Sequence, residues 1–109
     1  MRRPIIALLV LVATASPAAA AGGNAEKGKQ LFTTQKCTMC HSIAGKGNAK
    51  GALDDVGSRL TAAEIKQWLV DPAGMTTKAK ATRKPPMKIK ALAAEDVDAL
   101  VAYLSALKK

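Results

Sequence analysis

The sequence predicts a small all-α domain with three main helices joined by long connections. Three segments carry apolar side chains at the spacing of an amphipathic helix, and no stretch shows convincing strand alternation. The two connections, residues 42–59 and 72–92, are rich in glycine and proline. Loops this long in so small a domain are functional, unless the assignment of helices is wrong.

The first helix is expected to begin at Asn24, because asparagine is a favoured N-cap residue. Glu26 then lies in the first turn, where a negative charge suits the positive end of the helix dipole. The helix should end before Cys37. One face of it is small or apolar: Gly28, Leu31 and Phe32.

The second helix has the clearest start. Thr61 and Glu64 are spaced as a capping box, and Leu60 and Ile65 stand at the positions of a hydrophobic staple around it. The pair Asp71-Pro72 should end this helix, because proline disfavours helical backbone in the residue before it. Its apolar face consists of Ile65, Trp68 and Leu69.

The third helix is predicted from about Ala94 to Leu107. Leu92 and Val97 can form a staple at its start, although Ala93 is a poor N-cap. Its apolar residues recur at helical spacing: Val97, Leu100, Val101 and Leu104.

The N-terminus has the order of a secretory signal peptide. Arg2 and Arg3 form a charged start, residues 5–15 are almost wholly apolar, and a block of alanines follows at 18–21. A membrane anchor is the alternative, but eleven apolar residues cover only about half of the ~20 that a spanning helix needs. We therefore expect residues 1–21 to be a signal peptide cleaved after Ala20 or Ala21, and residues 22–109 to form one exported, soluble domain, periplasmic or otherwise outside the cytoplasm.

The domain that remains is small and basic. Removing Arg2 and Arg3 from the 17 basic residues leaves 15 against 8 acidic ones, a net charge near +7. This charge suggests an acidic partner, and nucleic acid is not expected outside the cytoplasm. Its only aromatic residues are Phe32, Trp68 and Tyr103. Because so short a chain can build only a small core, something else is expected to fill the interior.

Residues 36–41, "KCTMCH", contain both cysteines and the only histidine. Cys-x-x-Cys-His is the spacing for covalent haem attachment: the Cys37 and Cys40 thiols add to the two vinyl groups of one porphyrin, and His41 becomes the proximal iron ligand. A zinc site usually needs four ligands, and the chain has no further Cys or His. A thioredoxin-like pair expects a strand-helix context, and a structural disulfide does not require His41. We therefore predict one covalent haem c, around which the loops are wrapped.

A haem bound by one histidine has a sixth iron position to fill, and methionine can take it. Met87 follows Pro85-Pro86, which restrict the backbone, and it lies late in the second connection, which must cross the haem face opposite His41. Met75 is the alternative, in the flexible start of the same connection. We favour Met87, while core filling is the usual role of any methionine.

The chain resembles the small soluble class I cytochromes c over nearly all of its mature part. The resemblance is carried by pieces in the family's order: "GKQLF", "CTMCH", "VGSRLTAAEIKQWL", "PPMK" and "DVDALVAYL". It implies three main helices wrapped with long loops around one covalent haem, with Met87 as sixth ligand. It also implies that Gly28 and Phe32 pack against Leu100 and Tyr103, where the first and last helices cross.

The resemblance also points to a departure. Similar sequences have "KGP" where this chain has "KGA", and the proline carbonyl there accepts the ring N–H of the proximal histidine. The carbonyl of Ala52 is expected to accept this hydrogen bond instead, on a backbone that is less rigid without the proline ring.

Two further residues can meet the haem propionates. Trp68 would do so through its indole N–H and Arg59 through its guanidinium, while core packing and a solvated surface are their alternatives.

With both axial positions occupied by protein, the iron can only change its oxidation state. The sequence therefore predicts a monomeric one-electron carrier and not an enzyme. Its expected partners are redox proteins with acidic docking surfaces, such as an oxidase, a reductase or a dehydrogenase, and no stable membrane insertion is expected. A haem enzyme or gas sensor with a labile sixth ligand, and an accessory subunit of a larger complex, are the alternatives. Six basic residues without an acid between them would form the docking rim: Lys78, Lys80, Arg83, Lys84, Lys88 and Lys90.

Overall fold

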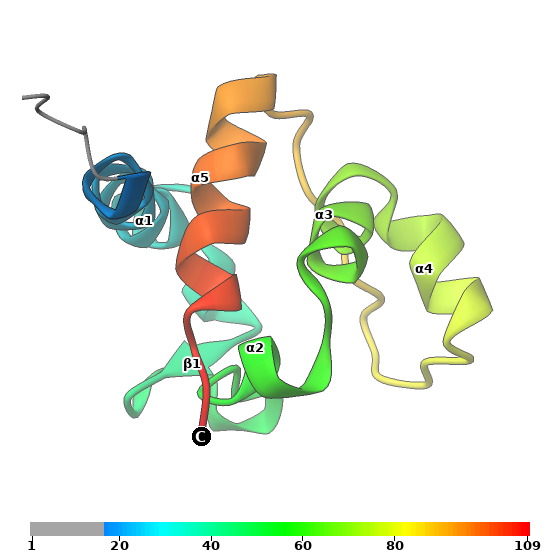
Figure 1. The fold of residues 1–109 in the computed structure, drawn as a ribbon. Coiled ribbons are helices and arrows are strands. Elements are labelled where there is room, and N and C mark those ends of the chain that lie inside the picture. The colour runs from blue at the N-terminus through cyan, green and yellow to red at the C-terminus, as the bar shows by residue number, and fades with distance from the viewer. Residues whose placement is uncertain (1–16) are drawn as a thin grey trace, which may run out of the picture.

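The computed structural model describes residues 17–109 and is mostly helical, which confirms the predicted all-α fold. In chain order, its elements are α1 (Pro17–Thr34), η1 (Cys37–Met39), β1 (Ser42–Ile43), β2 (Lys46–Gly47), η2 (Ala49–Gly51), α2 (Val56–Arg59), α3 (Ala62–Val70), α4 (Pro72–Lys78) and α5 (Ala94–Ser105). Figure 1 shows α5 at the centre, with α1 on one side and α3 and α4 on the other. None of the described helices is long and apolar enough to cross a membrane.

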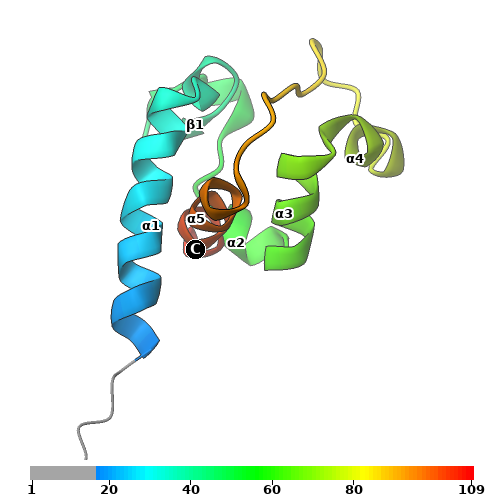
Figure 2. The ribbon, with the colours of Figure 1, turned by 90° about the horizontal axis from the view of Figure 1, so that it is seen from above.

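Helices α1 and α5 cross at close range, and Figure 2 shows α1 running past α5 from above. Gly28 makes this approach possible, because a Cβ on it would lie 2.7 Å from the Cβ of Tyr103 and even closer to the backbone carbonyl of Ala99. Next to it, the rings of Phe32 and Tyr103 meet edge to face, with centroids 6.3 Å apart. Leu100 is fully buried. The expected crossing of the first and last helices is confirmed.

The core lies between α1, α3 and α5. Its buried apolar residues form one cluster: Phe32, Val56, Ile65, Leu69, Val97, Leu100 and Leu104. Helix α3 starts at the predicted capping box, in which the Thr61 hydroxyl accepts from the Glu64 backbone N–H and the Glu64 carboxylate accepts from the Thr61 N–H. Helix α5 begins at Ala94 as predicted, with no side-chain cap from Ala93, and ends at Ser105, two residues earlier than expected.

Both long connections contain helical turns that the sequence analysis missed. In the second connection, Asp71 ends α3 and at once caps α4, because its carboxylate accepts from the backbone N–H of Gly74, and Pro72 occupies the first helical position. In the first connection, α2 forms a single turn that buries Val56. The backbone N–H of Gly57 donates to the carbonyl of Leu107 at 2.7 Å, which fastens this turn to the end of the chain.

The first helix is longer than predicted. It begins at Pro17, so Asn24 lies inside the helix and does not cap it. The predicted signal-peptide residues 1–16 lie outside the described residues, and the predicted cleavage positions at Ala20 and Ala21 fall within α1. Lys27 on α1 forms a salt bridge with Asp96 on α5, with Nζ 3.1 Å from Oδ1, which supports the same crossing from its exposed side.

Candidate haem-binding site

The two thiols and the imidazole lie on one tight turn that follows α1. The backbone reverses at Lys36, whose φ of 58° is left-handed, and enters the 3-10 helix η1. The carbonyl of Cys37 then accepts from the backbone N–H groups of Cys40 and His41, at 3.2 and 2.9 Å. Cys37 is half-buried, Cys40 is exposed, and neither is in a disulfide. The turn therefore presents both thiols beside the histidine.

The ring of His41 is oriented by a backbone carbonyl. Its Nδ1 lies 3.0 Å from the carbonyl oxygen of Gly51, which can only accept, so Nδ1 carries the proton and Nε2 is the atom available to a metal. The expectation that Ala52 supplies this carbonyl is wrong by one residue. Helix η2 ends at Gly51 and turns its carbonyl towards the ring, whereas Ala52 is extended and pairs with Ser42 in a parallel β-bridge.

Burial shifts the pKa values of two side chains on this turn. The pKa of His41 lies below its usual value, mainly because burial disfavours the charged imidazole. The hydrogen bond to Gly51 raises this pKa in part, and the positive charge of Arg83 lowers it further. The neutral imidazole is the form that binds a metal. Burial also raises the pKa of the Cys37 thiol. The lowered pKa of His41 therefore favours the neutral imidazole, and the hydrogen bond to Gly51 leaves Nε2 as the available ring nitrogen.

The two methionines considered as sixth ligand occupy different environments. Met87 is half-buried in the extended segment that joins α4 to α5, where it packs against the edge of the core. Met75 is buried on α4, with 8% of its surface exposed. Met39, between the two cysteines, is 70% exposed. Met75 thus has the environment of a core residue. Met87 lies on a segment without helix or strand, which can adapt its shape to a bound group.

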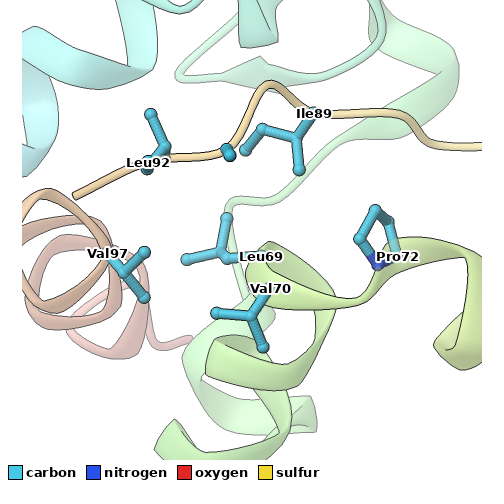
Figure 3. Close-up of a pocket in the computed structure, with 7 residues that line it drawn as sticks. Leu69, Val70, Pro72, Ile89, Leu92 and Val97 are labelled. Carbon is cyan, nitrogen blue, oxygen red and sulfur yellow. The ribbon is translucent and has the colours of Figure 1, made fainter. Parts of the chain in front are cut away.

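A half-open pocket of about 220 Å³, lined by apolar residues, lies beside the segment that carries Met87. Figure 3 shows its walls, which come from the end of α3, the first residue of α4, the first turn of α5 and the extended segment. The lining residues are Leu69, Val70, Pro72, Ile89, Ala91, Leu92 and Val97. This part of the molecule is consequently less tightly packed than the α1–α5 crossing.

The structure places the two residues considered for propionate contacts differently. Trp68 is half-buried on α3, and its indole N–H has no hydrogen-bond partner among the described residues. Arg59 is on α2, where its Nε donates to the Asp55 carboxylate at 2.9 Å. The indole N–H of Trp68 thus has no protein partner in this part of the chain, whereas Arg59 already has a carboxylate partner in the N-cap residue of its own helix. Both propionate contacts stay predictions.

The donor set of this site fits a covalently attached haem. Two unpaired thiols stand three residues apart on a turn, and the imidazole beside them has its Nδ1 occupied and its Nε2 available. Gly51 admits the close approach of this turn, because a Cβ there would lie 2.9 Å from the His41 Nδ1. Two methionine side chains, Met75 and Met87, lie on the second long connection.

Comparison with known proteins agrees with this site. The model of the cytochrome c family matches residues 25–108. The chain is also 31% identical over 93 residues to cytochrome c oxidase subunit 2 of Alkalihalophilus pseudofirmus, a match that covers 77% of this chain and 26% of that protein. The chain thus spans about a quarter of the length of this relative. No solved structure gives a significant match. With its covalent haem c and its role in electron transfer, the chain belongs to the cytochrome c family.

Proposed function

We propose that this protein is an exported monohaem cytochrome that carries single electrons between redox partners and catalyses no reaction of its own. The observation that supports this most strongly is the turn at residues 37–41. There, two unpaired thiols are followed directly by an imidazole whose Nδ1 is hydrogen-bonded to the Gly51 carbonyl, at 3.0 Å. A bound haem c supplies a one-electron iron couple.

The roles of the individual residues follow from this arrangement. Cys37 and Cys40 would hold the haem through two thioether bonds, and Nε2 of His41 and the sulfur of Met87 would bind its iron. If both side chains bind, an exogenous molecule could reach the iron only by displacing one of them. This favours a carrier over a haem enzyme or a gas sensor.

Replacing each methionine separately tests the sixth ligand. Met87→Ala should abolish the sulfur-to-iron charge-transfer band, lower the midpoint potential and let carbon monoxide bind to the reduced protein. Met75→Ala should keep the band and lose about 2–3 kcal/mol of stability, because Met75 is buried and its loss leaves a cavity. The reverse pattern of bands would move the iron ligand to Met75.

We propose that the carrier docks through the basic segment that runs from the last residue of α4 to the start of α5. All six of its basic residues are exposed: Lys78, Lys80, Arg83, Lys84, Lys88 and Lys90. Lys36 and Lys46, on either side of the attachment turn, are exposed as well. Because Met87 lies within this segment, the charges would surround the haem edge and steer an acidic redox partner towards it.

A second candidate role is that of an electron-transfer subunit in a larger complex. It is favoured by the likeness to an oxidase subunit 2, although the match covers only 26% of that protein. Size-exclusion chromatography of native extracts, monitored at the haem absorbance, separates the two roles. A free carrier elutes as a small monomer, whereas a subunit elutes with a large assembly.

A further inference from the structure

Arg83 contacts the loop that holds the proximal histidine, although it lies in the segment that carries the proposed sixth ligand. Its Nη1 borders the space that a Cβ on Gly51 would fill, together with the carbonyl oxygen of Cys40 and the His41 Nδ1. The guanidinium is therefore seated on a glycine backbone next to the imidazole. This contact joins the two long connections of the domain at the site itself.

The charge of Arg83 is not compensated at this position. None of the salt bridges in the described part of the chain involves Arg83. The two acidic side chains of the first connection have other partners: Asp54 accepts from the Ala44 backbone N–H at 2.7 Å, and Asp55 is paired with Arg59. Among the described basic residues from 78 to 90, Arg83 is the one whose charge acts on His41. Its neighbour Lys84 carries the same charge and is exposed, as Arg83 is, but it does not act on His41.

We propose that Arg83 raises the reduction potential of the haem iron, by holding one uncompensated positive charge over Gly51 and beside the proximal ligand. This proposal rests on the proposed function, in which His41 binds the iron. Reduction adds one electron to the iron, taken from the electrode or chemical reductant, and no bond forms or breaks. A nearby positive charge favours the state with the lower positive charge, which is the reduced one.

Proximity separates Arg83 from the other basic residues of the segment. Charges that project into solvent are screened over ~8 Å at physiological ionic strength, so their effect on the iron fades as salt is added. Arg83 is exposed as well, but its guanidinium contacts the loop that orients the ligand, so its charge acts on His41 over less than this screening length. Its effect on the potential should therefore persist at high salt.

Spectroelectrochemical titration of the haem-loaded protein tests this, with Arg83→Gln, Arg83→Lys and the matched control Lys84→Gln. We expect Arg83→Gln to lower the midpoint potential at both low and high salt. Arg83→Lys should stay closer to the parent, because it keeps the charge. Lys84→Gln removes the same charge one residue away and should give a smaller shift that disappears at high salt. Equal shifts for Arg83→Gln and Lys84→Gln, or a rise in potential for Arg83→Gln, would overturn the proposal.

Two spectra distinguish this effect from a loss of the iron ligand. The charge-transfer band should be retained in Arg83→Gln. Its loss would show that Arg83 keeps the iron ligand in place and does not act on the midpoint potential through its charge. In the proton NMR spectrum of the reduced protein, the Nδ1 proton of His41 should shift in Arg83→Gln and stay in place in Lys84→Gln. If the parent protein itself lacked the band, the proposal that Met87 binds the iron would be wrong. The comparison of midpoint potentials among the variants would still decide the role of Arg83.

Discussion

Replacing Gly28 with alanine tests the crossing of α1 and α5. The new Cβ would lie 2.7 Å from the Cβ of Tyr103 and closer still to the carbonyl group of Ala99. Neither neighbour is the free end of a flexible side chain, so the two helices would have to separate. That movement would loosen the contact between the Phe32 and Tyr103 rings and expose part of Leu100, which is now fully buried.

Two opposing effects set the size of the change. Alanine is preferred over glycine in a helix by about 1 kcal/mol, so in an open helix this substitution would stabilise the protein. Overpacking a close contact costs about 1–3 kcal/mol, and the backbone position of Ala99 puts this site at the upper end. We therefore expect Gly28→Ala to lower the free energy of unfolding by about 2 kcal/mol.

Guanidinium chloride unfolding of the haem-loaded protein, followed by Trp68 fluorescence, measures this difference. Lys29→Ala is the matched control, because Lys29 is the next residue on α1 and is exposed, so its replacement should change stability by less than about 0.5 kcal/mol. A Gly28→Ala protein as stable as the parent, or more stable, would refute the close crossing.

The remaining predictions concern docking and export. Charge reversal at Lys84 or Lys88 should slow electron transfer with an acidic oxidase or reductase more than reversal at Lys108 or Lys109, with rates measured at several salt concentrations by stopped flow. Equal effects at both places would contradict a defined docking surface and indicate only that the protein is basic overall. Mass spectrometry of the protein purified from its native cells should show a mature N-terminus at residue 21 or 22, whereas an intact leader would exclude cleavage.

Local sequence signals were sufficient to predict the helices that begin with a defined cap or carry apolar residues at helical spacing over several turns. The start of α3 could be predicted because Thr61 and Glu64 satisfy each other's backbone within four residues. Helix α4 was missed, although Asp71 followed by Pro72 is itself a helix-start signal, because the same pair was taken only as the end of α3. The four-residue α2 has no such signal, and it is held by the distant carbonyl of Leu107.

The chemistry of the site could be predicted further than its geometry. Spacing alone identified Cys37, Cys40 and His41 as one unit, since all three lie on a single turn. The acceptor for the histidine ring could not be predicted to the residue, because it depends on how η2 turns the carbonyl of Gly51. The contact between Arg83 and Gly51 joins two separate loops, so no local pattern could reveal it.

The most direct test of the account is the visible and near-infrared spectrum of the purified haem-loaded protein, recorded with and without carbon monoxide. A carrier with His41 and Met87 as axial ligands should show a sulfur-to-iron charge-transfer band when oxidised, and its spectrum when reduced should be unchanged by carbon monoxide. A protein that lacks this band and binds carbon monoxide would have an open iron position. That result would contradict the carrier role and favour a haem enzyme or gas sensor.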